Sequence, residues 1–368
     1  MKRVNPYIAS VLSAAFLILE GCSDDTDSFI PEPTPTAIEI EVPEMEISGP
    51  DPITTLTIPQ FCVSAFTKPD QWGGSTQCIM DNVVVTRTGL NKWSYSPAVN
   101  WPDYPVDFFA TYPASVKVDL NPWWEHIIDN YSDPTNSTDL CVAVRMQSNQ
   151  SDGRIRLNFK HVTARLLGSI KSSMDPRYQV RVKMARLKDF SEYGRFVMPR
   201  VTTDSKMTPQ DLMKCWTTYT NTGTERILFQ AQDDSYLQLT DKPYETVTGG
   251  LYFIPFDLEP ETFYGSYAGT RLEIAYQIYD TETNQIIWPD KSVHYPFSWE
   301  DCVLSYIFLE DATPDGKWYP AVTYHYEVDI VRPTLEYPQQ AKSHNPSNHS
   351  KHSAFAQPIL TCKVTYPQ

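Results

Sequence analysis

Cys22 is the residue of this sequence whose surroundings best define a chemical role. It follows a basic pair at residues 2–3, an apolar run over residues 8–19 and Gly21. A basic head, a short apolar run and small residues before a cleavage point are typical of a secretion signal. The run is shorter than the about 20 residues that a membrane-spanning helix needs. A thiol at the first position after cleavage can carry acyl chains, so we expect lipid attachment at Cys22.

The residues on both sides of Cys22 resemble known export signals. Residues 19–22 resemble a bacterial lipobox, whose cysteine receives lipid and becomes the mature N-terminus. The residues that follow resemble the acidic tag that Bacteroidetes use to send lipoproteins to the outer face of the outer membrane: Ser23, Asp24, Asp25, Thr26 and Asp27. Stable anchoring takes more than one acyl chain, each contributing about 0.8 kcal/mol per buried CH₂. We therefore predict a surface-exposed outer-membrane lipoprotein; the alternative is an ordinary signal peptide and an incidental cysteine.

The remaining titratable residues form no catalytic motif. The sequence contains no G-x-S-x-G, H-E-x-x-H, P-loop or G-x-G-x-x-G pattern. His344, His349 and His352 lie within nine residues, and imidazole binds transition metals, but their segment is polar and is interpreted as a solvated linker. His161, beside Phe159, is interpreted as a packed or hydrogen-bonded structural histidine. We predict no enzyme activity, no cofactor and no metal site.

Aromatic residues offer a second kind of candidate site. Trp123 and Trp124 are adjacent, and exposed aromatic rings can stack on the apolar faces of sugars. The competing interpretation is that these rings fill a core or a domain interface. If they are exposed, a different function fits: a glycan-binding β-sandwich lipoprotein of a polysaccharide-uptake system.

Composition limits the class of protein. The net charge is −15 and no Lys/Arg cluster is present, which excludes a nucleic-acid binder because phosphate contacts need clustered positive charge. The sequence has 22 Tyr and 30 Pro, which favours short strands and irregular turns over helices. No C-x-x-C pair is present, so the pairing or free state of the remaining cysteines stays open: Cys62, Cys78, Cys141, Cys215, Cys302 and Cys362.

Period-2 alternation predicts an all-β fold of two tandem antiparallel β-sandwiches with few short helices. Ile155, Leu157 and Phe159 alternate with polar residues, as do Val180, Val182 and Met184, and as do Leu272, Ile274, Tyr276 and Ile278. Strands are expected at 55–66, 82–88, 105–111, 141–146, 154–159, 162–170, 179–186, 225–231, 236–240, 250–256, 271–279 and 322–330. Helix-start patterns predict short helices from Thr208 to about Trp216 and over 122–130.

The chain is expected to divide into five parts. Residues 1–21 are a signal peptide, 22–54 an acidic, Pro-rich tether, 55–200 and 201–337 the two sandwiches, and 338–368 a polar leash with a terminal strand. Residues 38–42 alternate inside the tether and could form a strand. The terminal strand places apolar residues at alternate positions: Leu360, Cys362, Val364 and Tyr366.

Three groups of residues resemble the fimbrillin-like (Mfa-like) lipoproteins of Bacteroidetes. These are residues 93–97, 101–102 and 106–113, then 157–165, then 251–255 with 316–319 and 324–326. The resemblance covers roughly residues 55–330 and implies two β-sandwiches of transthyretin-like topology. It also implies a subunit or accessory of the type V pilus. Such subunits travel as lipoproteins, lose an N-terminal strand to an arginine-specific protease, and accept a strand from a neighbouring subunit.

The terminal strand has the design that such an exchange requires. A sandwich that lacks one strand presents unpaired backbone groups and an apolar groove, which an extended segment from another chain can fill. The leash over 338–357 spans about 25 Å as a flexible coil, enough to reach a neighbour. The alternative is that 359–366 pairs within its own second domain, since alternation does not distinguish the two. Expected partners are other subunits, the membrane through the lipid on Cys22, and surface glycans or proteins.

The sequence departs from the family pattern at the expected cleavage site. No Arg occurs between Arg3 and Arg87, and Arg87 lies inside a predicted strand. Either another enzyme removes the first strand, or the protein keeps its lipid as an anchor or stays outside the fimbrial shaft.

Overall fold

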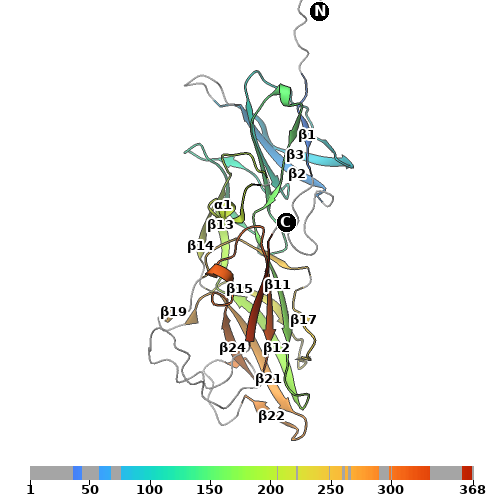
Figure 1. Cartoon of the computed structure of the whole chain (residues 1–368), viewed down its shortest axis with the longest axis vertical. Helices are drawn as coiled ribbons and strands as arrows, with labels where there is room; N and C mark the ends of the chain where they lie inside the picture. Colours follow the sequence, from blue (N-terminus) through green and yellow to red (C-terminus); the bar gives the residue numbers. More distant parts are fainter. Residues whose placement is uncertain are drawn as a thin grey trace, which may run out of the picture. The chain divides into compact units, whose positions relative to one another are not determined.

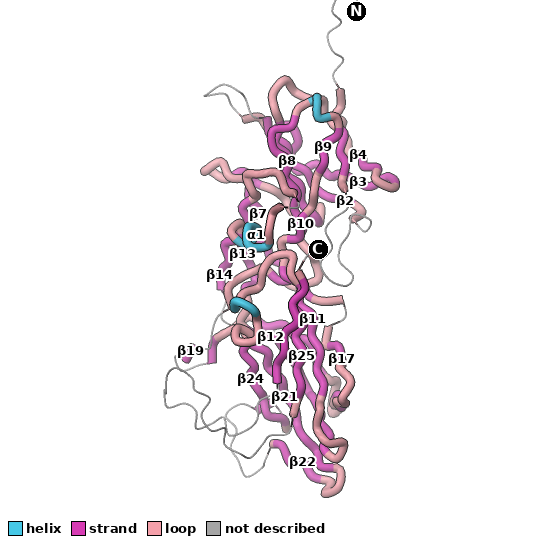
Figure 2. Tube along the Cα trace, viewed as in Figure 1, coloured by secondary structure: helices cyan, strands magenta, loops and turns pink. Residues whose placement is uncertain are grey.

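The structure, a computed structural model, describes residues 36–43, 58–67, 76–204, 206–220, 223–247, 249–258, 262–263, 267–289, 298–299, 301–331 and 359–366. Strands make up most of this part of the chain (Figure 2), which confirms the predicted all-β class. Residues 36–368 form one compact unit. Among the described residues, no helix has the length and apolar character needed to cross a membrane. Cys22, the acidic tag and the three histidines of the leash lie outside the described residues.

The first group of strands forms three layers. The middle layer is a six-stranded sheet of β10 (Lys160–His161), β8 (Cys141–Ser148), β5 (Val106–Tyr112), β2 (Gln60–Thr67), β3 (Cys78–Gly89) and β4 (Lys92–Ser94), in that order. One flanking layer is the pair β1 (Glu39–Glu41) and β9 (Arg154–Arg156). The other is a four-stranded sheet of β14 (Trp216–Thr220), β13 (Ser191–Val197), β7 (His126–Ser132) and β6 (Asp119–Leu120).

Strands β2 and β5 of the middle sheet are buried on both faces because each face packs against a flanking layer, whereas β3 and β4 are partly exposed. On β5, the successive residues Phe108 and Phe109 belong to different cores. Phe108 packs in the core that contains Ile40 of β1, and Phe109 packs in the core that contains Phe196 of β13. A strand buried on both faces reads as a continuous apolar run, as β2 and β5 do.

The second group of strands is a two-sheet sandwich around one large core. One sheet has the order β17 (Tyr244–Glu245), β11 (Ala164–Lys171), β25 (Thr323–Asp329) and β26 (Ile359–Thr365), with β18 (Leu251–Phe253) also paired to β11. The other has the order β15 (Glu225–Gln230), β12 (Tyr178–Lys188), β21 (Arg271–Asp280), β24 (Cys302–Phe308) and β23 (Ser298–Trp299), with β16 (Leu237–Gln238) paired to β12 and β22 (Gln285–Trp288) to β21. β19 (Thr262–Phe263) pairs antiparallel with β20 (Tyr267–Ala268) in a separate two-stranded sheet.

The middle of the chain and its end share one sheet. β11 pairs in parallel with β25, and β25 pairs antiparallel with β26, so the green β11 and the dark red β26 of Figure 1 lie in the same sheet. The boundary expected near residues 195–220 stays a prediction. Among the described strands, β11 and β12 lie before this boundary in the chain. β11 pairs with β25 and β12 pairs with β21, and both of these partners lie after the boundary.

Local structure decides two helix predictions: one is wrong, and the other is confirmed over a shorter range than the expected end at about Trp216, where β14 begins. Residues 122–130 are not a helix: Asn121 accepts hydrogen bonds through its side-chain oxygen from the backbone N–H groups of Trp123 and Glu125, each at 2.9 Å, and β7 begins at His126. The Asn-Pro pair therefore starts a turn. The helix predicted from Thr208 is confirmed as α1 (Pro209–Met213), where Thr208 and Asp211 cap each other.

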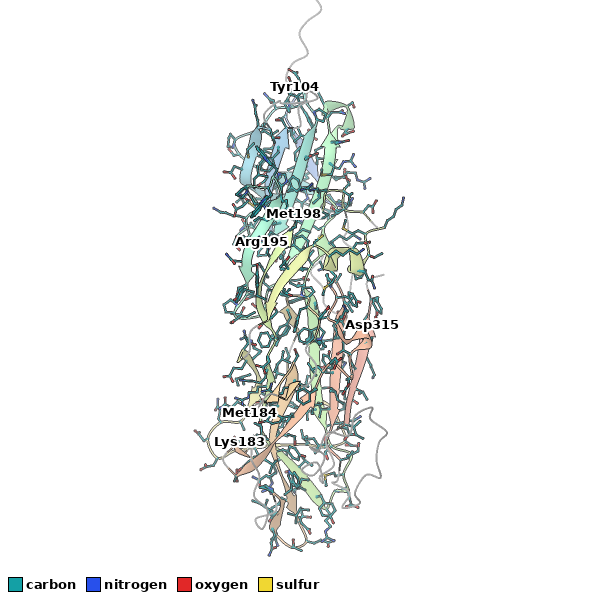
Figure 3. The ribbon with its side chains drawn as sticks, turned by 90° about the vertical axis from the view of Figure 1, so that its left-hand side faces the viewer. Tyr104, Lys183, Met184, Arg195, Met198 and Asp315 are labelled. Carbon is teal, nitrogen blue, oxygen red and sulfur yellow. The ribbon has the colours of Figure 1, made fainter. Side chains whose placement is uncertain are left out.

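A β-bulge changes the alternation predicted for β12. The register against β21 shifts between Val182 and Met184. Val182 faces the large core, whereas Met184 packs in a separate cluster with Ala275 and Cys302 on the other face of the sheet. Lys183 and Met184, labelled in Figure 3, mark this position. A single extra residue reverses which face the following side chains occupy, and the sequence pattern gives no sign of it.

Candidate functional site

Strand β1 lies between two neighbouring segments of backbone. The N–H of Ile38 donates to the carbonyl oxygen of Val99 at 2.9 Å, and the N–H of Trp101 donates to that of Thr36 at 3.0 Å. On the other side, β1 runs parallel to β9, and the N–H of Leu157 donates to the carbonyl oxygen of Glu41 at 2.9 Å. The segment predicted as an isolated strand inside the tether is therefore an integral part of the first sandwich.

The inward side chains of β1 fill a continuous apolar site. Ile38, Ile40 and Val42 are 2%, 7% and 1% exposed and pack in the core with Ile155 and Leu157. Burying one such side chain contributes about 1.5–3 kcal/mol. We call the site that these three side chains occupy, bounded by β9 and residues 99–101, the β1 groove. Loss of β1 would leave this groove open and its backbone edges unpaired.

The outward side chains of β1 contact charged and polar neighbours. Glu39 accepts from Arg154 Nε at 2.8 Å, and a carboxylate oxygen of Glu41 lies 3.5 Å from Arg156 Nε. The hydroxyl of Tyr95 donates to the carbonyl oxygen of Ile38 at 2.8 Å. Both arginines are largely exposed, so each ion pair contributes at most about 1 kcal/mol. The two ion pairs therefore add little to the stability of the fold, but they favour acidic residues at positions 39 and 41.

The C-terminal strand pairs within its own chain in this structure. β26 is antiparallel to β25 from Asp329↔Ile359 to Thr323↔Thr365, and it is the outer strand of its sheet among the described strands. The inward side chains are only partly buried against the large core: Leu360, Cys362 and Val364. Tyr366, which continues the pattern, is exposed. Of the two pairings that the sequence left open, the single chain adopts the one within its own second sandwich.

Lys363 on β26 lies near an acidic residue of β25. It is opposite His325, and its charge helps to hold the pKa of Glu327 below its usual range, although the main cause is the hydrogen bond from Lys171 to Glu327. On the inward face, burial raises the pKa of the Cys362 thiol to about 11. β26 therefore has a basic outward face and an unreactive inward thiol in this position.

Trp123 and Trp124 lie on the turn between β6 and β7 and are exposed, at 71% and 69%. The hydrogen bonds to Asn121 fix the turn, and Trp124 adopts a left-handed backbone conformation with φ of 61°. Of the two interpretations left open by the sequence, core filling is therefore wrong for this pair. The rings are available for stacking on a ligand.

His161 belongs to a buried polar cluster. Its Nδ1 lies 2.6 Å from Asp139 Oδ2 and 3.5 Å from Cys141 Sγ, and Thr163 donates to Asp139 Oδ1 at 2.9 Å. Asp139, Cys141 and His161 could in principle offer three metal ligands. Burial, with the nearby Asp139 charge, raises the pKa of the Cys141 thiol, so the metal-free chain keeps this thiol protonated. His161 is buried and hydrogen-bonded as expected, and its purely structural role stays a prediction.

The neighbours of His161 could not be predicted from the sequence, because the register in which two strands pair brings them together. β8 and β10 pair so that Cys141 faces His161 directly. No spacing in the sequence indicates that pairing. The six described cysteines form no disulfide; two of them are half-buried, three are buried, and Cys78 is exposed.

Comparison with protein-family models identifies one family. Residues 60–295 match the family described as fimbrillin-like. A fimbrial protein from Bacteroides vulgatus has a similar crystal structure, with 14% identity, a TM-score of 0.51, and coverage of 90% of this chain and 99% of that one. At that identity the likeness supports the fold alone.

Two candidate cell adhesion proteins have lower structural similarity. The one from Bacteroides uniformis has 13% identity and a TM-score of 0.43, covering 90% of this chain and 98% of that one. The one from Bacteroides ovatus has 11% identity and a TM-score of 0.44, covering 91% and 99%. A search of curated protein sequences found no match.

Proposed function

The chain belongs to the fimbrillin-like family, and from this membership we propose that it is a surface-exposed lipoprotein that serves as a subunit or accessory of a fimbria. In this role it joins neighbouring subunits by exchange of an extended strand and contributes to cell adhesion. The proposed role is structural and adhesive, and it involves no catalysis. Its proposed location is the cell surface, held to the outer membrane through lipid on Cys22 and directed there by residues 23–27.

The observation that carries the proposal is the match in pattern between β1 and β26. Ile38, Ile40 and Val42 fill the β1 groove at alternate positions, and β26 offers apolar residues at the same spacing. The β1 positions are almost fully buried, whereas those of β26 are only partly buried at a sheet edge. Detaching a partly buried strand from the edge of a sheet requires less free energy than detaching an internal strand. β26 is therefore suited for donation to a neighbouring subunit.

The intact chain would therefore be a precursor in which both sites are filled from within. β1 occupies the groove and β26 rests on β25. Assembly would require removal of β1 and release of β26. Since no Arg lies between Arg3 and Arg87, removal of β1 would need a protease of another specificity acting between residues 44 and 57. If no such cleavage occurs, the lipid stays and the protein works as an anchor or accessory.

Deletion of residues 358–368 tests the exchange. Loss of subunit ladders from unheated gels, with secretion and folding retained, would support donation by β26. Ladders that persist would reject it. The paired substitution Thr361→Ser with Thr365→Ser changes only the outward face of β26 and is the matched control, which should leave ladders intact. The N-terminal sequence of the protein recovered from cells then distinguishes an anchor, with lipid on Cys22, from a shaft subunit beginning after β1.

The exposure of Trp123 and Trp124 supports a second candidate function, glycan binding at the cell surface. Aromatic faces held on a fixed turn can stack on sugar rings at little entropic cost. Replacing both by alanine should reduce retention of the protein on polysaccharide without changing its melting temperature. Tyr104→Ala, which alters another exposed aromatic residue, is the control. Equal retention of all three proteins would remove this candidate.

A further inference from the structure

We propose that the β1 groove selects its incoming strand by charge, and that it prefers an acidic strand from a different subunit over β26 of a second copy of this chain. The inference rests on the proposed strand exchange and names the partner for it. The partner segment carries aliphatic residues at three alternate positions and Asp or Glu at the two positions between them.

The groove makes two kinds of contact with its occupant. The first kind binds backbone atoms: Val99 and Leu157 pair with the main chain of β1, and Tyr95 donates to the Ile38 carbonyl. Any extended strand can satisfy these groups. The second kind depends on side chains, because Arg154 and Arg156 stand directly opposite Glu39 and Glu41 in the strand register. Only the second kind distinguishes one strand from another by charge.

β26 does not complement the two arginines. Three of its four alternate apolar residues can fill the groove in two registers, using either 360, 362 and 364 or 362, 364 and 366. The outward positions between them are then 361 and 363, or 363 and 365. Reversing the strand direction exchanges the two positions but does not remove either. In every arrangement Lys363 therefore replaces one of the two glutamates and faces Arg154 or Arg156, while a threonine replaces the other.

Replacing an acidic strand in the groove by β26 makes binding less favourable. A strand like β1 forms two ion pairs with the groove, whereas β26 forms none and adds one contact between like charges. Like charges directly opposite each other in a sheet are destabilising. Because the arginines are exposed, each ion pair and the like-charge contact change the binding free energy only modestly. Added together, they should give about a tenfold preference for the acidic strand. In its own chain, by contrast, Lys363 lies near Glu327.

The same arrangement disfavours a homopolymer. A subunit whose donor strand mismatches its own groove propagates poorly into a uniform shaft. It pairs better with a different subunit on the groove side, as expected for a component at the end of a fibre or in a mixed polymer. This chain would donate β26 to a groove with an acidic rim.

The test uses the purified full chain with a specific protease site placed between β1 and β2, so that β1 can leave after cleavage. A fluorophore before β1 reports its release when an unlabelled peptide takes its place. Three peptides are compared: residues 36–43, residues 359–366, and residues 359–366 with Lys363→Glu. The last two differ at one side chain, so their ratio isolates charge from apolar fit.

We expect the K363E peptide to displace β1 severalfold more effectively than the unmodified 359–366 peptide at low salt. This ratio is below the tenfold expected for a strand with two acidic residues, because the K363E peptide forms only one of the two ion pairs. The ratio should be smaller at 0.5 M salt because screening weakens exposed charges. In the Arg154→Glu, Arg156→Glu variant the order of the two peptides should reverse. Lys214→Glu, an exposed charge reversal on the residue that follows α1, should leave the ratio unchanged.

The outcomes separate the two proposals. Equal displacement by the two 359–366 peptides would overturn charge selection and leave strand exchange standing. Failure of all three peptides, including residues 36–43, would overturn the proposed exchange, and charge selection with it. Self-assembly of the cleaved K363E chain under conditions where the unchanged cleaved chain stays monomeric would support both.

Discussion

Tyr95 donates a hydrogen bond from its hydroxyl to the carbonyl oxygen of Ile38, 57 residues earlier in the chain, at 2.8 Å. This bond ties β1 to the rest of the first sandwich at the position where its first buried side chain enters the core. Tyr95→Phe removes the donor and keeps the ring. We expect a loss of about 1 kcal/mol in the free energy of unfolding and faster hydrogen exchange along β1.

The control for this change is Tyr104→Phe, which removes the hydroxyl of an exposed tyrosine. Urea unfolding of the two variants, read by tryptophan fluorescence, gives the comparison. Equal stability of the two, with unchanged exchange at β1, would contradict the role assigned to Tyr95.

His126 should make the protein less stable as the pH falls from about 6.5 toward 4. Burial lowers its pKa to about 4; the Asp107 charge opposes this and Arg200 adds to it. Its ring stacks on Phe109 with centroids 3.9 Å apart. Below pH 6.5 the unfolded chain binds a proton that the folded chain does not, so stability rises with pH in this window. Since His126 is partly exposed, we expect about 1 kcal/mol.

His126→Phe removes this titration and keeps an aromatic ring on Phe109. The melting temperature of the variant, measured between pH 4 and 7.5 beside that of the unchanged protein, should fall less steeply below pH 6.5. Parallel curves for the two proteins would show that His126 does not carry the effect.

Cys362 should report whether β26 is attached. Burial raises its thiol pKa to about 11, so it should react slowly with a maleimide while β26 lies on β25. The exposed Cys78 should react first. In a Cys78→Ser background, labelling at Cys362 should accelerate severalfold under conditions that release β26 from β25 without a neighbouring groove to receive it. A fast, condition-independent rate would mean that β26 is not held in the position described.

Glu273 should be costly to remove although it lies on the polar side of β21. It is 2% exposed, and its carboxylate accepts from Arg186 Nη2 at 2.6 Å and from Arg271 Nη2 at 2.7 Å. Glu273→Ala would leave Arg186 and Arg271 without this carboxylate. Breaking a buried ion pair lowers the free energy of unfolding by about 3–5 kcal/mol. Lys214→Ala, which breaks an exposed pair with Asp211, should cost less than about 1 kcal/mol. Equal losses on urea unfolding would contradict this ranking.

The sequence predicted the strands whose alternation is local. Residues 38–42, 271–279 and 359–366 were all expected to be extended, and each contains a strand. β21 differs in one respect: its residues alternate, yet both faces are buried, because Arg271 and Glu273 are covered as an ion-paired network. Charge in the sequence predicted a solvated face, and pairing with distant residues reversed that outcome.

Which strands are neighbours could not be predicted from the sequence. β1 was expected to be part of a tether, because its packing partners Ile155 and Leu157 are more than a hundred residues away. The β1 groove is therefore visible only in three dimensions. In the same way, alternation in β26 fixed which side chains share a face but left its pairing partner open.

The parallel pairing of β11 with β25 has a consequence for biosynthesis. Ser169 and His325 contact each other across this pair although 156 residues separate them. A ribosome must therefore add most of the polypeptide before β11 can meet its neighbour, and closing so large a loop is slow. A nascent molecule therefore cannot finish its second sandwich until synthesis is nearly complete, and its early strands stay without their final partners for most of that time.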